Sequence, residues 1–302
     1  MIKRTIYFGN PVRLSLANWQ LVCTFPEGTR EKVTLPIEDL GVVVLDHQQI
    51  TITHQAIAAM LDNCVALVTC DNHHLPAGLL LPLSGNLLQS ERFNAQVNSS
   101  LPLRKQLWQQ TIQSKIRNQA KALQRLRHID LRPMMRWAAD VRSGDADNLE
   151  GRAAAYYWRA LYGELIPDFV RDREGVPPNN LLNYGYAIVR AMTARALVAA
   201  GLLPTLGIHH HNRYNAYCLA DDIMEPYRPY VDVAVDQMRD PDGEEQFPLL
   251  LPEIKRQLLS LTTQEVMIGG KRRPMMVAID VTAKSLMKCY SGEARSILYP
   301  EM

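Results

Sequence analysis

The segment spanning residues 101–128 most strongly limits the folds open to this chain. It contains no proline after Pro102, and its apolar residues recur at helical spacing. The pattern predicts one long helix, and further helical segments recur through most of the chain that follows. We therefore expect the larger, C-terminal part of the chain to be mainly α-helical.

The first 85 residues have a different pattern of apolar residues, one typical of strands. Short apolar runs at 4–8, 20–25, 41–45 and 50–53 are rich in β-branched residues and are separated by Gly, Pro, Asn and Asp. A helical segment at about 54–62 leads into another strand at 64–70. No glycine-rich phosphate loop follows any strand, so a nucleotide-binding α/β fold is not indicated. This part is expected to form a compact β-rich domain.

Residues 83–86 are the best candidate for a linker between these two patterns. The sequence thus predicts an α+β protein with a β-rich domain at 1–85, followed by a larger, mainly α-helical domain at 86–302. Both parts of the 302-residue chain are long enough to bury a core of their own.

Several helices are expected in the second part. One is predicted at about 148–163, capped by Asn148 or Asp147. Another is predicted at 181–200, ended by Gly201, and a third at 221–238, kinked at Pro226. A small hairpin around Gly269 and Gly270, with strands at 266–267 and 275–277, precedes a last helix at 282–290.

The long helix carries basic residues but no acidic ones. Between residues 101 and 129 the sequence has seven Lys or Arg and no Asp or Glu, although the net charge of the whole chain is only +2. Such a helix repels itself unless an anionic partner is present, and nucleic-acid phosphate is the commonest one. Arg117, Lys121 and Arg125 are therefore candidate DNA contacts. The alternative is that acidic side chains elsewhere in the fold pair with this helix.

The densest group of metal-competent side chains lies between residues 209 and 225. Three successive histidines, 209–211, are followed by Asp221, Asp222 and Glu225. Asp222 and Glu225 are three residues apart and share one face of a helix. Carboxylate and imidazole together suit Mn²⁺ and accept Mg²⁺, ions that assist displacements at phosphorus. A solvated acidic helix start beside a surface histidine loop is an equally good interpretation from spacing alone.

Glu150 stands at the start of a helix whose next residues are nearly all small, aromatic or apolar. Small residues let helices pack closely, and a buried carboxylate is costly unless it is paired or bound to metal. The simpler interpretation is a first-turn glutamate that the helix dipole favours.

The cysteines and the lengths of the apolar stretches indicate the cell compartment. The five cysteines are scattered and never form a CxxC pair, which fits a reducing cytosol and argues against a thiolate zinc site. The longest apolar stretches, such as 77–83 and 196–206, are shorter than the roughly 20 residues that a membrane span needs. The protein is expected to be cytoplasmic, with no membrane partner.

Three blocks of sequence resemble the CRISPR-associated integrase family, Cas1. They are residues 148–154 (NLEGRAA), residues 183–187 (NYGYA), and the pair 207–212 (GIHHHN) and 220–229 (ADDIMEPYRP). Their order and spacing, and the β-then-helical layout, resemble that family over essentially the whole chain. The chain is most similar to the shorter forms found beside type II effector systems.

The resemblance implies a site that binds Mg²⁺ or Mn²⁺ through Glu150, His210 and Glu225, which are also the catalytic residues. Some family members carry aspartate where this chain has Glu225. Asp222 matches a position expected to assist the metal or a water molecule, and Arg228 is expected to contact DNA.

The implied chemistry is metal-dependent endonuclease and integrase activity in antiviral defence. The 3′-hydroxyl of a short DNA fragment attacks a phosphodiester of the CRISPR repeat array by transesterification. The implied partners are double-stranded DNA, a second copy in a homodimer, and the small Cas2 protein in a heterohexamer, with other adaptation or effector subunits.

Two other functions compete with this one. A non-catalytic, DNA-binding architectural protein would use the basic helix but leave Glu150, His210 and Glu225 without a role. A metal-dependent phosphodiesterase for small substrates would use the metal but not the basic helix.

Overall fold

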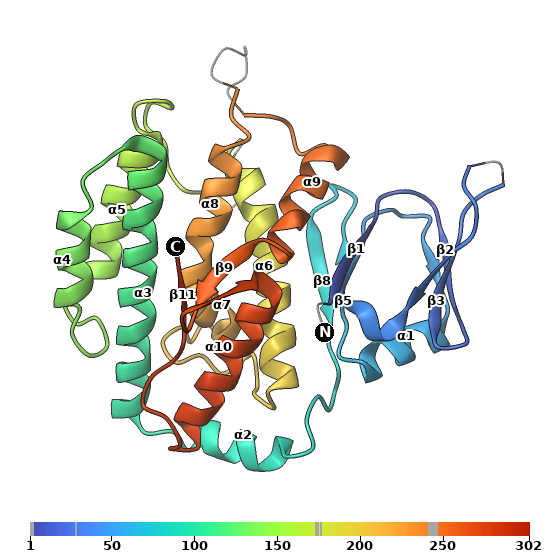
Figure 1. Ribbon diagram of the computed structural model, residues 1–302, viewed down its shortest axis with the longest axis horizontal. Coiled ribbons are helices and arrows are strands. Elements are labelled where there is room, and N and C mark those ends of the chain that lie inside the picture. The colour runs from blue at the N-terminus through green and yellow to red at the C-terminus, as the bar shows by residue number, and fades with distance from the viewer. Residues whose placement is uncertain (1–2, 28, 173–174, 176, 241–246) are drawn as a thin grey trace.

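The computed structural model describes residues 3–27, 29–172, 175, 177–240 and 247–302. Within that part, the chain forms a β-rich region followed by a larger helical region, which lie side by side (Figure 1). This confirms the predicted α+β fold class. Among the described helices, none combines the length and apolarity that crossing a membrane requires.

The β-rich region contains two four-stranded sheets. One has the order β1-β5-β7-β8 and the other β4-β3-β2-β6. In the first sheet β1, β5 and β7 are parallel and β8 is antiparallel to β7. The elements are β1 (Arg4–Phe8), β2 (Arg13–Ala17), β3 (Gln20–Thr24), β4 (Val33–Pro36), β5 (Leu40–Leu45), β6 (Thr51–Ile52), α1 (His54–Asp62), β7 (Ala66–Cys70) and β8 (Pro76–Leu80).

The sheet containing β5 separates two hydrophobic cores. Because successive side chains of a strand point to opposite faces, Val43 joins the core of the β-rich region while Val42 and Val44 join the helical core. A buried ion pair also links the two regions, since Lys255 Nζ lies 2.7 Å from Asp46 Oδ2 at the end of β5. The β-rich region is thus packed against the helices through a shared sheet.

The helical region surrounds α6, which is buried along most of its length. Its elements are α2 (Gln89–Val97), α3 (Leu101–Arg127), α4 (Arg132–Asp140), α5 (Leu149–Tyr162), α6 (Asn179–Ala199), α7 (Cys218–Met224), α8 (Arg228–Asp236), α9 (Pro252–Leu259) and α10 (Met275–Tyr290). A small sheet of order β10-β9-β11 joins β9 (Glu265–Ile268), β10 (Lys271–Pro274) and β11 (Pro300–Glu301). The long helix α3 packs against α5, α8 and the turn between α7 and α8.

Gly185 allows α6 and α8 to approach closely. A methyl group added at Gly185 would lie 2.4 Å from Val231 Cγ1, which is too close for any side chain. The glycine of the block 183–187 therefore has a packing role.

The structure corrects two of the predicted elements. The expected kinked helix at 221–238 is two helices, α7 and α8, separated by a 3₁₀ turn at Glu225–Tyr227, because Pro226 has no amide hydrogen to continue the α-helical ladder. The last helix begins at Met275 rather than at 282, so residues 275–277 are not a strand. The predicted boundary at 85/86 falls between the end of β8 at Leu80 and the start of α2 at Gln89.

Candidate metal centre

Glu150 is fixed in the first turn of α5 by two capping side chains. Asn148 Oδ1 accepts a hydrogen bond from Gly151 N (3.2 Å), and the two carboxylate oxygens of Asp145 accept from Leu149 N and Glu150 N (2.9 Å each). These bonds satisfy amides that have no partner within the helix. The Glu150 side chain, 23% exposed, leaves the helix start toward α3.

Glu225 occupies the first position of the 3₁₀ turn between α7 and α8. The turn is attached to α3, because Asn118 Nδ2 donates a hydrogen bond to the carbonyl oxygen of Pro226 (2.8 Å). The Glu225 side chain is only 6% exposed. The break that Pro226 imposes thus places a buried carboxylate against the long helix.

His210 lies on a loop that one buried carboxylate organises. Asp222 Oδ2 accepts hydrogen bonds from Ile208 N (2.7 Å) and His209 N (2.9 Å), and Asp222 Oδ1 lies 2.5 Å from His210 Nδ1. A methyl group on Gly207 would lie 2.3 Å from the His210 carbonyl oxygen, so the loop requires glycine there. Because Nδ1 faces Asp222, His210 Nε2 is the nitrogen left for a metal or substrate.

The neighbouring histidine is held differently. The His209 ring stacks on Trp108 of α3, with ring centres 4.1 Å apart and planes within 2°, and Trp108 also meets His210 edge-on at 5.6 Å. Trp108 therefore contacts both imidazole rings. That of His209 is stacked on it, and that of His210 meets it edge-on and binds Asp222. His209 thus packs against Trp108, and His210 as the metal ligand stays a prediction.

Lys115 of α3 joins the two glutamates. Its Nζ lies 2.7 Å from Glu150 Oε1 and 2.6 Å from Glu225 Oε2. The contact with Glu150 is a hydrogen bond, whereas Glu225 Oε2 is buried and accepts no hydrogen bond of acceptable geometry. The second contact is therefore an ion pair, and Arg228 occupies the other carboxylate oxygen of Glu225.

The charges of this cluster shift the pKa values of its members. Burial alone would raise the pKa of Glu225, but Arg228 and Lys115 outweigh it and lower that pKa to about 2. Burial would lower the pKa of Lys115, yet Glu225 and Glu150 together raise it. The hydrogen bond to Asp222 raises the pKa of His210. At neutral pH Glu225 is thus ionised and Lys115 is charged.

The residues present suit a divalent metal in their chemistry. Two carboxylates and an imidazole are ligands for Mg²⁺ or Mn²⁺, and Glu225 Oε2 is a buried acceptor without a hydrogen bond. As they stand, no three His, Cys, Asp or Glu side chains of the described residues meet at metal-binding distance. The Lys115 ammonium lies between the two glutamates, so a metal bound by both would need that ammonium to move.

Arg228, expected to contact DNA, is directed inward. Its Nε lies 2.9 Å from Glu225 Oε1, and its guanidinium carbon lies 4.7 Å from the centre of the Tyr186 ring. Its side chain is 25% exposed. The contact with DNA remains a prediction, and the structure adds that Arg228 pairs with a candidate ligand.

Some basic side chains of α3 are exposed to solvent, and others pair with acidic side chains. Arg117 and Arg125 are exposed and Lys121 is half-buried, so all three predicted DNA contacts are accessible at least in part. Lys115 pairs with the two glutamates, and Arg127 forms an ion pair with Asp236 of α8. Arg117 and Lys121 line a cavity of about 550 Å³ beside the C-terminal strand β11.

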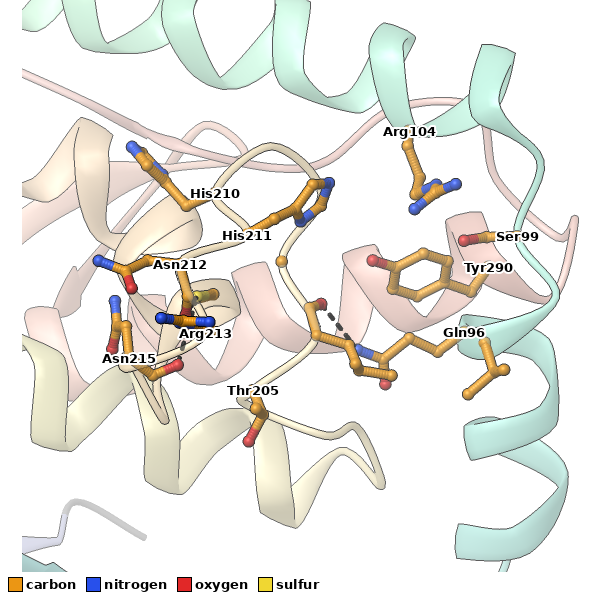
Figure 2. A pocket seen from close by; sticks show the side chains of 14 residues that line it. Gln96, Ser99, Arg104, Thr205, His210, His211, Asn212, Arg213, Asn215 and Tyr290 are labelled. Carbon is orange, nitrogen blue, oxygen red and sulfur yellow. Dashed lines mark hydrogen bonds between the residues drawn. The ribbon is translucent and has the colours of Figure 1, made fainter.

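A second cavity, of about 470 Å³, adjoins His210 (Figure 2). Figure 2 shows Arg104 extending from α3 toward Tyr290 of α10, with His211 beside them. The Arg104 Nε atom is buried without a hydrogen bond. The cavity thus presents cationic and hydrogen-bonding groups next to His210, as a phosphate-bearing substrate requires.

The basic residues of the long helix do not all play one role. Lys115 is one of the seven between residues 101 and 129, yet it lies on the same helical stripe as Trp108, Ile112 and Ile116, all of which are buried. A lysine on a buried stripe indicates an internal acidic partner. That periodicity could have separated Lys115 from Arg117 and Arg125.

Comparison with known proteins places these features in a family. Residues 7–240 match the family model described as CRISPR associated protein Cas1. The chain is 34% identical to the CRISPR-associated endonuclease Cas1 of Neisseria meningitidis serogroup C, over 100% of this chain and 97% of that protein. It is 28% identical to a CRISPR-associated endonuclease Cas1 of Pyrobaculum aerophilum, over 87% of this chain and 90% of that protein.

Solved structures share the fold. A casposase bound to integration product superposes with a TM-score of 0.76 at 21% identity, covering 97% of this chain and 92% of that chain. A Cas1 protein from Thermotoga maritima gives a TM-score of 0.70 at 15% identity, covering 96% and 98%. The family match extends over the segments that carry Glu150, His210 and Glu225, and the chain therefore belongs to the Cas1 family of CRISPR-associated proteins.

Proposed function

We propose that this protein is a metal-dependent DNA endonuclease and integrase that inserts short DNA fragments into a CRISPR repeat array. The observation that carries the proposal is that Glu150 of α5 and Glu225 of the 3₁₀ turn both contact Lys115 of the basic helix α3, while His210 is near enough for both carboxylates to raise its pKa. The relatives named CRISPR-associated endonuclease and the fold shared with an integration-product complex support the same activity.

Glu150, His210 and Glu225 would hold the divalent ion, Mg²⁺ or Mn²⁺, and Asp222 would orient His210 through Nδ1. When bound, the ion would lower the pKa of the attacking hydroxyl and neutralise charge on the phosphoryl group. Lys115 and Arg228 add positive charge next to the two glutamates, where DNA phosphate would approach.

The reaction is a transesterification and needs no protein nucleophile. The 3′-oxygen of the fragment forms a bond to phosphorus, and the bond from phosphorus to the 3′-oxygen of the repeat strand breaks. The proton leaves the attacking hydroxyl, and the departing 3′-oxygen takes one up. One phosphodiester replaces another, so no external energy source is required.

Double-stranded DNA would lie along the exposed basic residues of α3, including Arg117, Lys121 and Arg125. The protein would act as a homodimer joined to the small Cas2 protein in a heterohexamer, with further adaptation or effector subunits. Solved complexes that contain Cas1 and Cas2 share this fold and support the Cas2 partner.

The experiment that tests the proposal is strand joining of a short duplex into a supercoiled plasmid that carries a repeat array. Products are separated on a gel, with and without Cas2 and with Mn²⁺, Mg²⁺ or a chelator. We expect joined products that require the metal. Binding of the duplex without metal-dependent joining or cleavage would instead favour a non-catalytic, architectural role.

A further inference from the structure

The Lys115 ammonium occupies the place where two acidic side chains from different elements meet. It contacts Glu150 Oε1 at 2.7 Å and Glu225 Oε2 at 2.6 Å, and its side chain is only 11% exposed. Buried lysines are rare unless they are paired, and here the pairing uses the two carboxylates that the proposed function assigns to the metal. Lys115 and the metal therefore compete for the same oxygen atoms.

The charges of the metal-free cluster balance. Two carboxylates, Glu150 and Glu225, face one ammonium, Lys115, and one guanidinium, Arg228. A divalent ion added to this buried, neutral group would create an excess of positive charge, which is costly in a site of low dielectric. The cost falls if one of the resident cations withdraws from the carboxylates.

Lys115 is the resident cation that can withdraw more easily. Arg228 is held over the Tyr186 ring at 4.7 Å, and a planar guanidinium is constrained by such stacking. Lys115 has a flexible four-carbon stem and borders a cavity of about 240 Å³, which Glu225 and Arg228 line on one side and Gln119 and Asp232 also line. The fold therefore provides room for its ammonium to turn from Glu150 toward Asp232.

We propose that Lys115 is a resident counter-ion of the metal centre. In the metal-free protein its ammonium holds Glu150 and Glu225 together, and a divalent ion displaces it on binding. This inference rests on the proposed function, because it takes both glutamates as metal ligands. Lys115 then acts as a positioning residue, which keeps a buried carboxylate pair assembled and weakens its affinity for any cation that cannot displace it.

The test measures Mn²⁺ binding by titration calorimetry and thermal melting with and without Mn²⁺, using the full chain. The variants are Lys115→Met and Lys115→Gln, the second of which can still donate hydrogen bonds if the first fails to fold. Lys105→Met, at an exposed position of the same helix, is the matched control. Glu225→Gln identifies binding at the proposed centre.

We expect both Lys115 variants to bind Mn²⁺ about tenfold more tightly than wild type, since a competing charge at contact distance is gone. Without metal they should melt at lower temperature, and Mn²⁺ should raise their melting temperature more than that of wild type. Lys105→Met should match wild type in both measurements.

Two results would overturn the inference in distinguishable ways. In the first, wild type binds Mn²⁺, Glu225→Gln abolishes that binding, and both Lys115 variants bind no more tightly than wild type. This would show that Lys115 supports the site without being displaced. The proposed function would survive that result. Wild-type protein that binds no Mn²⁺ would overturn the proposed metal centre and this inference with it.

Discussion

His210 Nδ1 lies 2.5 Å from Asp222 Oδ1, and the same carboxylate also binds backbone amides of the loop that carries His210. Asp222 is fully buried, whereas the His210 side chain is 46% exposed. The buried acid therefore determines both the loop conformation and the ring nitrogen that His210 presents. Asp222 therefore positions His210, the candidate ligand, through Nδ1.

The first prediction concerns this contact. Asp222→Ala should weaken Mn²⁺ binding by about 10- to 100-fold, the usual effect of removing a carboxylate that orients a ligating histidine. Titration calorimetry measures the affinity. Asp221→Ala is the neighbouring control, because Asp221 binds Arg190 and Asn215 rather than His210. Equal losses in the two variants would mean that general disruption of α7, not the His210 contact, causes the effect.

The second prediction concerns the exposed basic residues of α3. Reversing the charge of Arg117, Lys121 and Arg125 together, each to Glu, should weaken binding to unrelated DNA sequences alike. It should also reduce the slope of log affinity against log salt by about three, roughly one for each lost phosphate contact. Filter binding across a salt series measures the slope, with Arg30→Glu on the β-rich region as the control. An unchanged slope would show that this face of α3 does not meet DNA.

Much of the fold can be predicted from the sequence, because the local sequence patterns agree with which residues are buried. Residues 4–8 and 54–62 form the expected strand and helix, since β-branched or helical periodicity is bounded by clear breaks. In the β-rich region three strands were not foreseen, at 13–17, 33–36 and 76–80, where the runs are short or include a proline. Helices α2 and α4 were not predicted either. The residues of α2 are mostly polar, and α4 has a proline in its first turn.

The candidate site was predictable as a set of residues but not as an arrangement. Motif resemblance pointed to Glu150, His210 and Glu225, and the structure gathers them around α3. The sequence could not show that Lys115 joins the two glutamates or that Trp108 stacks on His209, because both contacts connect segments far apart in the chain. Such contacts depend on how α3 packs, which local periodicity does not determine.

The third prediction concerns pH and a buried acid beside the site. Asp232 is 1% exposed and accepts hydrogen bonds from the hydroxyl groups of Tyr157 and Tyr186. Burial raises the pKa of Asp232 to about 6, against the opposing effect of the two hydroxyls. The folded protein therefore binds this proton more tightly than the unfolded chain, whose aspartates have pKa values of about 3.9.

The stabilising contribution of Asp232 is thus complete below about pH 4 and falls, by about 3 kcal/mol in total, as the pH rises through about 6. Urea denaturation of wild type and Asp232→Asn at about pH 4 and about pH 7 measures it. We expect the difference in free energy of unfolding, wild type minus variant, to decline by about 2 kcal/mol between these two pH values, because part of the effect already lies below pH 4. A difference independent of pH would show that Asp232 titrates alike in the folded and unfolded states.

We infer that Glu150, His210 and Glu225 together form the metal centre that joins DNA strands. The most direct measurement is Mn²⁺-dependent strand joining by Glu150→Ala, His210→Ala and Glu225→Ala, alongside His209→Ala and His211→Ala. Glu225 is a buried partner of Lys115 and Arg228, so Glu225→Gln is included to preserve side-chain volume. Each assay is run well below the melting temperature of its variant, so that loss of fold is not mistaken for loss of activity.

We expect each ligand variant to lose strand joining by about 1,000-fold or more, because several kcal/mol of charge stabilisation disappear with the metal. His209→Ala and His211→Ala should stay within about tenfold of wild type, since His209 stacks on Trp108 and the ring bound to Asp222 is that of His210. Equal losses at all three histidines, or full activity in a folded Glu150 or Glu225 variant, would contradict the account.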